Sequence, residues 1–346
     1  MIETSYPVEV EGLWVIEPRF NTAWDFSEGL AQVEINDKWG FVNTNGDMVI
    51  EPRFDFTRKF SEGLSAVLIG EKFGFIDSNG EFVIKPQFKD EDGTGIISFS
   101  NGLARVSINS KDGFIDPSGD FVIEPKFDYA SSFSEGLAAI GIGGKCGYIK
   151  TNGETLVEPR FEYCAAFSEG LARIRINDKE GYIDTSGDIV IKPSFECCIG
   201  IFSEGRAAVN FDEILNIENT AAGYIETIYK KRGFINTDGD VVIETQFRDV
   251  GFFSEGLAAI QARDGRWGYI NAMGEIIIEP QFSKTWHFSE GLAAVQTSDG
   301  KWGYINATGE MVIEPQFEYA DSFYDGLARV KVNNKLGFIR NPLRTP

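Results

Sequence analysis

Histidine and cysteine are scarce in this chain of 346 residues, which has one histidine, His287, and four cysteines. A catalytic histidine needs a nucleophile or a carboxylate within reach, and the sequence around His287 identifies neither, so we expect a structural role for it. The cysteines show no Cys-x-x-Cys spacing of the kind that zinc sites use. We therefore expect no metal site, no cofactor and no catalytic centre.

Positive charge and long apolar runs are also in short supply. The chain has 32 basic against 53 acidic residues, a net charge of −21, so phosphate repulsion would oppose binding to nucleic acid. No apolar run approaches the length of a membrane span. Residues 1–10 lack the basic region and apolar stretch of a signal peptide, so the cytoplasm is the default location. The acidic charge either keeps a long chain soluble or suits a basic partner.

Glycine, in contrast, recurs at a fixed place. A glycine that in most copies precedes Leu-Ala occurs nine times, mostly 34 or 35 residues apart, with two longer gaps of 39 and 51 residues. The positions are Gly29, Gly63, Gly102, Gly136, Gly170, Gly205, Gly256, Gly291 and Gly326. Recurrence at this period indicates a tandem repeat, in which each unit packs on its neighbours.

Each repeat contains three candidate strands, which in one copy cover residues 291–296, 301–306 and 310–317. The segments between them are short and rich in Gly, Asn and Asp, as in Asn177-Asp178 and Gly143-Gly144. Such connections are typical of hairpins between antiparallel strands. The sequence therefore predicts an all-β chain of nine antiparallel, three-stranded units.

Three motifs recur in a fixed order and carry a resemblance to a known family. In one copy they are Phe-Ser-Glu-Gly-Leu-Ala at 288–293, Lys-Trp-Gly-Tyr-Ile at 301–305 and Val-Ile-Glu-Pro-Gln-Phe at 312–317. This pattern resembles the bacterial WG-repeat family, also called KWG repeats, over residues 12–340. The resemblance implies a β-rich repeat array and no particular activity.

The expected organisation is one continuous body at 12–340, with a lead-in at 1–11 and a tail at 341–346. A long insertion at 210–231 falls between two strands and predicts an extended hairpin. The first repeat begins with an unmatched strand, and the last ends with another. These strands either pair and close a β-propeller-like ring, or end an open superhelical or solenoid-like array. Variable repeat number in the family favours the open array.

The tryptophan of the Trp-Gly motif is not kept in every repeat, whereas the glycine is. The nine residues at this position are Trp39, Phe73, Asp112, Cys146, Glu180, Arg232, Trp267, Trp302 and Leu336. Because unpaired buried charges are costly, we expect a position that is not fully buried in every repeat, where Trp is optional. The alternative is a polar, partner-binding surface formed by the four consecutive residues from Asp112 to Arg232. The adjoining insertion would add three apolar contacts, Ile217, Tyr224 and Tyr229.

The segments between strands of successive repeats vary most, and a constant framework with variable connectors is how repeat proteins present a binding face. Trp24 and Trp286 are equivalent candidates for exposed aromatic residues, and Tyr129, Tyr163 and Tyr319 share another register. The alternative is that these rings pack between repeats.

Two other repeated residue types have structural interpretations. The glutamate of Ser-Glu-Gly is too sparse, at one per repeat, for a calcium site, so we expect it to accept backbone N–H groups in a turn. Cys164 and Cys198 occupy equivalent places in adjacent repeats, which one continuous sheet would put about 14 Å apart at about 4.8 Å per strand. A disulfide needs Cα atoms within about 7 Å, so we expect all four thiols to be free.

Taken together, these features predict a non-catalytic scaffold that binds another protein along a repeat face. An acidic inhibitor or regulatory subunit of a basic enzyme is one form of it. A glycan-binding module that uses the repeated aromatic residues is the alternative. An enzyme would require Asp112 and Glu180 to approach within about 5–9 Å, as glycosidase carboxylates do.

Overall fold

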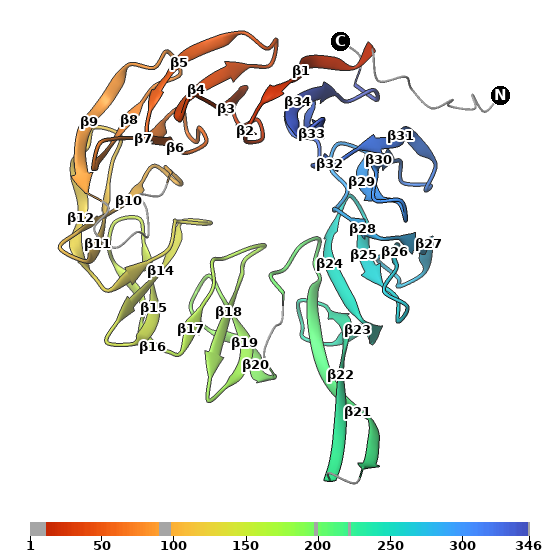
Figure 1. Ribbon diagram of the computed structural model, residues 1–346. Coiled ribbons are helices and arrows are strands. Elements are labelled where there is room, and N and C mark those ends of the chain that lie inside the picture. The colour runs from red at the N-terminus through yellow and green to blue at the C-terminus, as the bar shows by residue number, and fades with distance from the viewer. Residues whose placement is uncertain (1–11, 90–97, 197–199, 221–222, 345–346) are drawn as a thin grey trace. The chain divides into compact units, whose positions relative to one another are not determined.

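The computed structural model describes residues 12–89, 98–196, 200–220 and 223–344, without the side chains of residues 211–230 and 245. Two compact units make up the chain. The terminal unit consists of Pro7–Phe167 and Phe317–Pro346, and the middle unit is Ser168–Gln316. Throughout the described residues, the regular elements are strands, as the repeat pattern predicted (Figure 1).

The terminal unit contains five antiparallel sheets, which we call blades. The strands of the first two are β2 (Thr22–Ala23), β3 (Leu30–Ile35), β4 (Lys38–Asn43), β5 (Met48–Phe54), β6 (Phe56–Thr57), β7 (Ser65–Ile69), β8 (Lys72–Ile76) and β9 (Phe82–Lys89). The next two contain β10 (Ala104–Ile108), β11 (Lys111–Ile115), β12 (Phe121–Phe127), β13 (Tyr129–Ala130), β14 (Leu137–Ile142), β15 (Lys145–Lys150) and β16 (Thr155–Phe161). The fifth is formed by β32 (Tyr319–Ala320), β33 (Leu327–Val332), β34 (Lys335–Arg340) and β1 (Trp14–Phe20), and β17 (Tyr163–Cys164) also lies in this unit.

The middle unit repeats the same arrangement. Its strands are β18 (Leu171–Ile176), β19 (Lys179–Asp184), β20 (Ile189–Phe195), β21 (Ala207–Thr220), β22 (Gly223–Ile235), β23 (Val241–Phe247), β24 (Asp249–Ser254), β25 (Leu257–Gln261), β26 (Trp267–Asn271), β27 (Ile276–Phe282), β28 (Lys284–Thr285), β29 (Ala293–Gln296), β30 (Trp302–Ile305) and β31 (Met311–Phe317). The insertion lengthens β21 and β22 into one hairpin, paired from Ala207↔Ile235 to Thr220↔Gly223.

The prediction of three strands per repeat is wrong, because a complete blade has four. The additional strand is only two residues long in most blades and leads the sheet order, as Thr22–Ala23 does in β2-β3-β4-β5. It follows the preceding outer strand after a single residue, Asn21 in this copy. A strand of two residues is too short to show alternation of apolar and polar residues, so the sequence predicted a connector at this place. Four-stranded antiparallel blades are the building unit of β-propellers.

The expectation of an open array is also wrong, because the two terminal strands pair. β1 runs antiparallel to β34, with Trp14 opposite Ile339 and Phe20 opposite Leu336, and Figure 1 shows the two strands side by side. The first strand of the chain thus completes the last blade. Among the alternatives, closure through the terminal strands, as in a β-propeller, is the one that this pairing supports.

The invariant glycine of the Trp-Gly motif allows the outer strand of each blade to approach closely. A β-carbon on Gly337 would lie 2.5 Å from the carbonyl oxygen of Ile16, and one on Gly113 would lie 2.6 Å from that of Ile123. Opposite each glycine the outer strand carries extra residues, so the register shifts between Asp112↔Phe127 and Phe114↔Ile123. The proline of the Val-Ile-Glu-Pro-Gln-Phe motif lies in this bulge. Its missing N–H group therefore does not interrupt the hydrogen bonds between the two strands. The strand therefore continues past the proline instead of ending there.

The Ser-Glu-Gly turns link successive blades from head to tail. The glutamate and glycine both have positive φ, 54° at Glu28 and 76° at Gly29, so the turn presents consecutive N–H groups in one direction. The Glu28 carboxylate accepts bonds of 2.7 and 2.9 Å from the N–H groups of Glu62 and Gly63 in the next turn. The expectation that this glutamate accepts backbone N–H groups is confirmed, and the donors belong to the following repeat.

The same contact recurs in both units. In the terminal unit Asp325 accepts the N–H of Gly29 at 3.1 Å, which joins the last blade to the first. In the middle unit Glu169 accepts the N–H groups of Glu204 and Gly205 at 2.6 and 2.8 Å. An edge-to-face aromatic pair accompanies the turns, such as Phe338 with Phe26, whose ring centroids are 4.9 Å apart. Neighbouring blades are thus joined by two contacts, the aromatic pair and the hydrogen bonds of the carboxylate to backbone N–H groups.

The expectation of four free thiols is wrong for two of them. Cys146 and Cys164 form a disulfide with a Cα–Cα distance of 6.0 Å, whereas Cys197 and Cys198 lie outside the described residues. Cys164 and Cys198, at equivalent positions of neighbouring repeats, are not the bonded pair. The bond instead joins the Trp-Gly position of one repeat to the short strand that follows, where Trp39 and Phe56 make an aromatic contact in another copy.

The disulfide predicts a defined pattern of thiol reactivity and stability. In denaturant without reductant, Cys146 and Cys164 should resist alkylation, and mass spectrometry should recover their peptides joined. The bond spans 18 residues, so replacing both cysteines by alanine should lower the free energy of unfolding by about 3 kcal/mol. The reduced wild-type protein is the control and should match this variant. Alkylation of both residues before reduction would contradict the bond.

Pairing of the chain ends predicts that β1 is essential to the last blade. Deleting residues 1–20 removes the buried side chains of Leu13, Ile16 and Phe20, which are only 6%, 3% and 2% exposed. The free energy of unfolding in urea should fall by about 5–9 kcal/mol, from three buried side chains at about 1.5–3 kcal/mol each. A synthetic peptide of residues 12–21 should restore stability when added, whereas a scrambled peptide should not. Unchanged stability of the truncated chain would refute this role.

Candidate functional site: a pocket between the first blades of the terminal unit

The Trp-Gly position does not form an exposed polar surface in the described repeats with Asp, Cys or Glu. Asp112 is buried, accepts the N–H of Ala130 at 2.7 Å and pairs with Arg105 at 3.3 Å. Cys146 is buried in the disulfide. The expectation that this position is not fully buried in every repeat is confirmed, because Arg232, Trp267 and Leu336 are partly exposed. Charge is not the reason, since the charged residue Asp112 is buried together with its partner.

The middle unit also pairs the charged residue at the Trp-Gly position with an oppositely charged partner. Glu180 is fully buried, and its two carboxylate oxygens lie 3.3 Å from Arg173 and 2.7 Å from Arg175. Arg232 is half-buried and forms an ion pair with Asp249. A partner contact at these positions stays a prediction, and Ile217, Tyr224 and Tyr229 have side chains outside the described part of the chain. The buried carboxylates have structural roles, since each is neutralised within its own unit.

The connectors between repeats carry exposed aromatic residues at four of the five predicted positions, and the fifth, Tyr319, is half-buried. Trp24 and Trp286 are 47% and 41% exposed, and Tyr129 is 48% exposed. Trp286 stacks on Trp302 with ring centroids 6.2 Å apart. The connector residues just before each Phe-Ser-Glu motif differ between repeats, while the turn and the glycine contact stay constant. The connectors therefore form the surface on which one repeat differs from the next.

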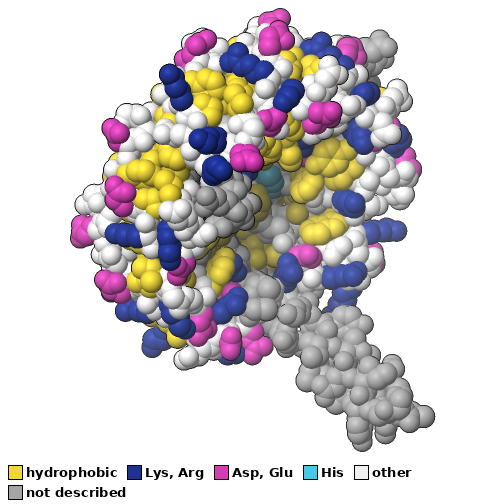
Figure 2. All heavy atoms as spheres, turned by 60° about the vertical axis from the view of Figure 1, so that its left-hand side comes forward, with side chains coloured by type: hydrophobic (Ala, Val, Ile, Leu, Met, Phe, Trp, Pro, Cys, Tyr) yellow, Lys and Arg dark blue, Asp and Glu magenta, His cyan; other side chains and the backbone are white. Residues whose placement is uncertain are grey.

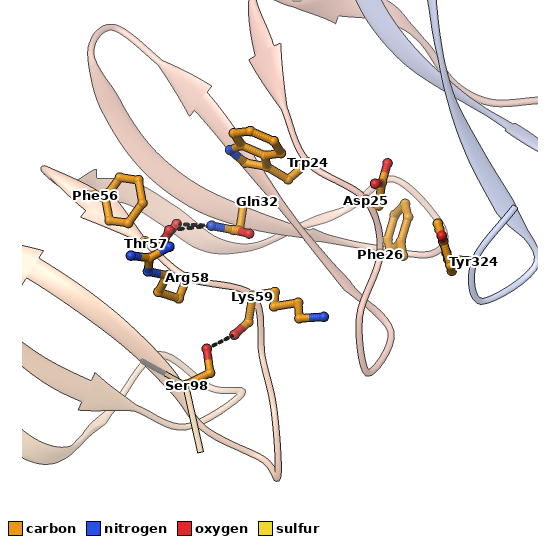
Figure 3. A pocket seen from close by; sticks show the side chains of 10 residues that line it. All are labelled: Trp24, Asp25, Phe26, Gln32, Phe56, Thr57, Arg58, Lys59, Ser98 and Tyr324. Carbon is orange, nitrogen blue, oxygen red and sulfur yellow. Dashed lines mark hydrogen bonds between the residues drawn. The ribbon is translucent and has the colours of Figure 1, made fainter. Parts of the chain in front are cut away.

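In the terminal unit these connectors enclose a pocket of about 740 Å³ (Figure 3). Its lining residues are Trp24, Asp25, Phe26, Gln32, Phe56, Thr57, Arg58, Lys59, Ser98 and Tyr324. They come from the first, second and last blades and from the start of the segment before β10. The pocket thus combines aromatic walls with charges of both signs, as ligand sites commonly do.

Hydrogen bonds fix one wall of this pocket. The Gln32 amide donates to the carbonyl oxygen and hydroxyl of Thr57, at 2.5 and 2.9 Å. Gln32 is 5% exposed and Thr57 is 1% exposed, so both bonds are shielded from water. The conformation of this wall is therefore fixed before a ligand binds. Arg58 is the next residue in the chain after Thr57.

Asp25, which also lines the pocket, belongs to a pair of carboxylates around Arg329. The Arg329 Nε lies 2.7 Å from Asp321 and 3.5 Å from Asp25, and its guanidinium lies 5.4 Å from the centre of the Trp24 ring. Burial raises the pKa of Asp25 to about 6, an effect that Arg329 opposes and Asp321 reinforces. Burial also raises the pKa of Tyr324. Asp25 thus changes charge near neutral pH, inside the pocket.

Two cations line the same pocket. The Arg58 guanidinium stacks over the Phe56 ring at 5.2 Å. Lys59 acts on Asp25 from a distance and lowers its pKa slightly against the effect of burial. Among the described residues neither cation forms an ion pair within 4 Å. The sequence contained both residues in a variable connector but gave no sign that Trp24 and Arg58 line one pocket, because they belong to different blades.

Other kinds of site find less support in the part of the chain that the structure describes. No three His, Cys, Asp or Glu side chains converge as metal ligands there. Neither does that part contain a helix long and apolar enough to cross a membrane. His287 lies against Phe252, with ring centroids 4.8 Å apart, and burial lowers its pKa. Apolar side chains form separate patches among charged ones on the face shown in Figure 2.

Blades of this kind, built on a recurring Trp-Gly motif, define a β-propeller-type repeat protein. The family model for the WG containing repeat matches nine segments, which are residues 11–39, 39–73, 73–111, 113–146, 147–179, 181–213, 233–265, 267–302 and 302–335. The chain therefore belongs to the WG-repeat family, as its motifs predicted. No curated protein matches the chain.

Among solved structures, one described as the eukaryotic initiation factor is similar in fold. The identity is 10%, the match covers 95% of this chain and 92% of that chain, and the TM-score is 0.61. BamB from Moraxella catarrhalis matches over 96% of this chain and 99% of its own, at 12% identity with a TM-score of 0.47. At these identities the first likeness concerns the fold alone, and we draw nothing from the second.

The raised pKa of Asp25 predicts a pH-dependent stability. A carboxyl whose pKa is higher in the folded state stabilises the fold when protonated, and this contribution is lost as pH rises from about 4 through about 6. Asp25→Asn keeps a neutral group, so the variant should melt at a higher temperature than wild type at pH 8 and at a similar one at pH 4. Groups remote from Asp25 titrate alike in both proteins, so their effects cancel in this comparison. An equal difference in melting temperature at both pH values would contradict the shift.

Proposed function

We propose that the chain is a non-catalytic scaffold that binds another protein through the connectors of its terminal unit. A segment of the partner would insert into the pocket at Trp24. The contrast between a constant framework and variable connectors supports this proposal, since repeat proteins bind through the positions that differ between repeats.

The observation that carries the proposal is the composition of the pocket. Trp24 is a large aromatic side chain that is almost half exposed at the rim. Tryptophan and arginine are enriched among residues that dominate the energy of protein interfaces. The pocket contains both, and the hydrogen-bonded Gln32–Thr57 wall prepares it in advance. A prepared pocket lowers the entropy cost of binding.

Net charge indicates the kind of partner. At −21 the chain attracts a basic protein over a distance and repels nucleic acid and anionic membrane surfaces. An acidic inhibitor or regulatory subunit of a basic enzyme is therefore the form of scaffold that we favour. No cofactor enters this function.

The non-catalytic part of the proposal rests on how the carboxylates are used. Asp112 and Glu180, which an enzyme would need as a pair, are each bound to arginine. Asp25 shares Arg329 with Asp321, and the pocket lining includes neither histidine nor cysteine.

The compartment is a proposal as well. The default is the cytoplasm, where reducing systems keep most thiols reduced. Recovery of an intact Cys146–Cys164 bond from cells lysed in alkylating agent would instead place the chain in an oxidising compartment.

Exposed aromatic side chains also favour a second candidate, a glycan-binding module. Sugar rings stack on aromatic faces, and Trp24, Tyr129 and Trp286 offer such faces. This candidate predicts binding to an array of glycans without any requirement for a protein partner.

Crosslinking in extracts of the source cells, followed by titration of the purified partner, tests the proposal. Trp24→Ala should raise the Kd at least about tenfold, the size expected of a residue that dominates an interface. Tyr129→Ala is the matched control, because Tyr129 is equally exposed in the same unit and does not line the pocket. Both variants should melt close to wild type.

An equal loss of affinity in the two variants would refute the pocket as the docking site. Binding to a glycan that Trp24→Ala abolishes, with no protein partner recovered, would replace the proposal by the second candidate.

A further inference from the structure

We infer that the Trp24 pocket binds a carboxylate group of a peptide, held by Arg58 and Lys59. This inference rests on the proposed function and specifies what the partner presents there. The carboxylate comes from an acidic side chain or from the C-terminus of the partner.

Arg58 offers a positioned guanidinium group. Its guanidinium is held in one orientation by stacking on Phe56, with 5.2 Å between the guanidinium carbon and the ring centre. Arg58 lines the pocket, and none of the ion pairs of the described residues includes it. An incoming carboxylate would therefore meet a guanidinium charge that the described part of the fold leaves without an ion pair.

Lys59 adds a second positive charge to the pocket. It lines the same pocket, and none of the ion pairs of the described residues includes it. No ion pair within 4 Å joins Lys59 to the nearby Asp25, whose carboxylate lies 3.5 Å from Arg329. Arg329 is in turn held by Asp321. The Asp25–Arg329–Asp321 cluster thus carries one net negative charge when Asp25 is ionised, and Arg58 and Lys59 outweigh it.

The surroundings of the two cations favour a carboxylate. A guanidinium with a fixed plane matches the planar, two-oxygen geometry of a carboxylate. Trp24 and Phe56 provide apolar surface beside the charges, which suits the carbon atoms of a peptide next to its acidic group. Arg58 and Lys59 adjoin each other in a chain of net charge −21, so the pocket would select a partner by one carboxylate while the remaining surface favours basic residues.

The experiment compares matched peptides by calorimetric titration of the full chain. The probes are acetyl-Gly-Phe-Glu-Gly-amide with its glutamine counterpart, and acetyl-Gly-Gly-Phe as free acid and as amide. At least one acid should bind about tenfold or more tighter than its neutral counterpart, the range for hydrogen bonds to charged groups. The first pair reports an acidic side chain, and the second reports a C-terminus.

Arg58→Gln should weaken binding of the acid about tenfold and leave the neutral peptide unaffected, and Lys59→Met should act in the same direction. Arg160→Gln is the matched control, because Arg160 also stacks on a phenylalanine, Phe161, at 4.9 Å in the same unit, outside the pocket. It should change neither affinity.

The acidic residues Asp90, Glu91 and Asp92 lie outside the described residues, next to the segment that leads to Ser98. If the inference holds, replacing them by Asn, Gln and Asn should leave the affinity for the acidic peptide within about twofold, the size expected of charges that form no close pair with the ligand. A large gain in affinity would mean that these carboxylates already neutralise Arg58 and Lys59, and would overturn the inference.

Three further results would overturn it. They are equal binding of acid and neutral peptides, an equal loss in Arg160→Gln, and displacement of the peptide by inorganic phosphate at far lower concentration than by acetate. If the partner protein depends on Trp24 but not on Arg58, the scaffold function stands and the carboxylate does not. If the peptides bind as expected while no partner protein is found, the carboxylate site stands and the scaffold function fails.

Discussion

Close approach of two backbones at the Trp-Gly glycine is the constraint on which each blade depends. The outer strand bulges toward this glycine, and any β-carbon there would lie closer than 3 Å to a carbonyl oxygen in eight of the repeats. The proline in the bulge and the glycine opposite it are therefore two halves of one contact. The neighbouring Trp position is less restricted, because only packing volume and neutralised charge are required of it.

Three different chemistries consequently fill that position. Trp39 packs beside Phe56, Cys146 is bonded to Cys164, and Asp112 is paired with Arg105. Each partner comes from a neighbouring strand or from the short strand of the next repeat. A repeat thus tolerates a change from aromatic to ionic to covalent packing, provided that both partners change together.

Much of the fold was predictable from sequence because the same strand and turn motifs recur in nine repeats. The two-residue turns were recognisable from Asn177-Asp178 and Gly143-Gly144, which have positive φ at both residues. Burial of Glu180 was not predictable, since its partners Arg173 and Arg175 lie on the neighbouring strand with no motif to mark them. A sequence sign of closure did exist. Leu336-Gly337 lacks a following Glu-Pro strand, while Glu17-Pro18 lacks a preceding Trp-Gly.

The pocket was less accessible to sequence reasoning. Variable connectors indicated where a binding surface lies, and the exposure of Trp24 confirms the prediction of an exposed aromatic residue there. The pocket itself depends on the juxtaposition of connectors from different blades with Tyr324. Such proximity follows from how blades pack and not from the composition of any one segment.

Sharing of the last blade between both ends of the chain also has a consequence during synthesis. β1 is made before its partner β34, which leaves the ribosome on the order of 20–60 s later at about 5–20 residues per second. Through that interval β1 is an unpaired strand that wrong partners can reach. Pro18 and the bulge around it make β1 a poor template for such pairing, because the proline removes a donor and the bulge disrupts the ladder. The feature that fits β1 to Gly337 in the finished protein therefore also protects the nascent chain from aggregation.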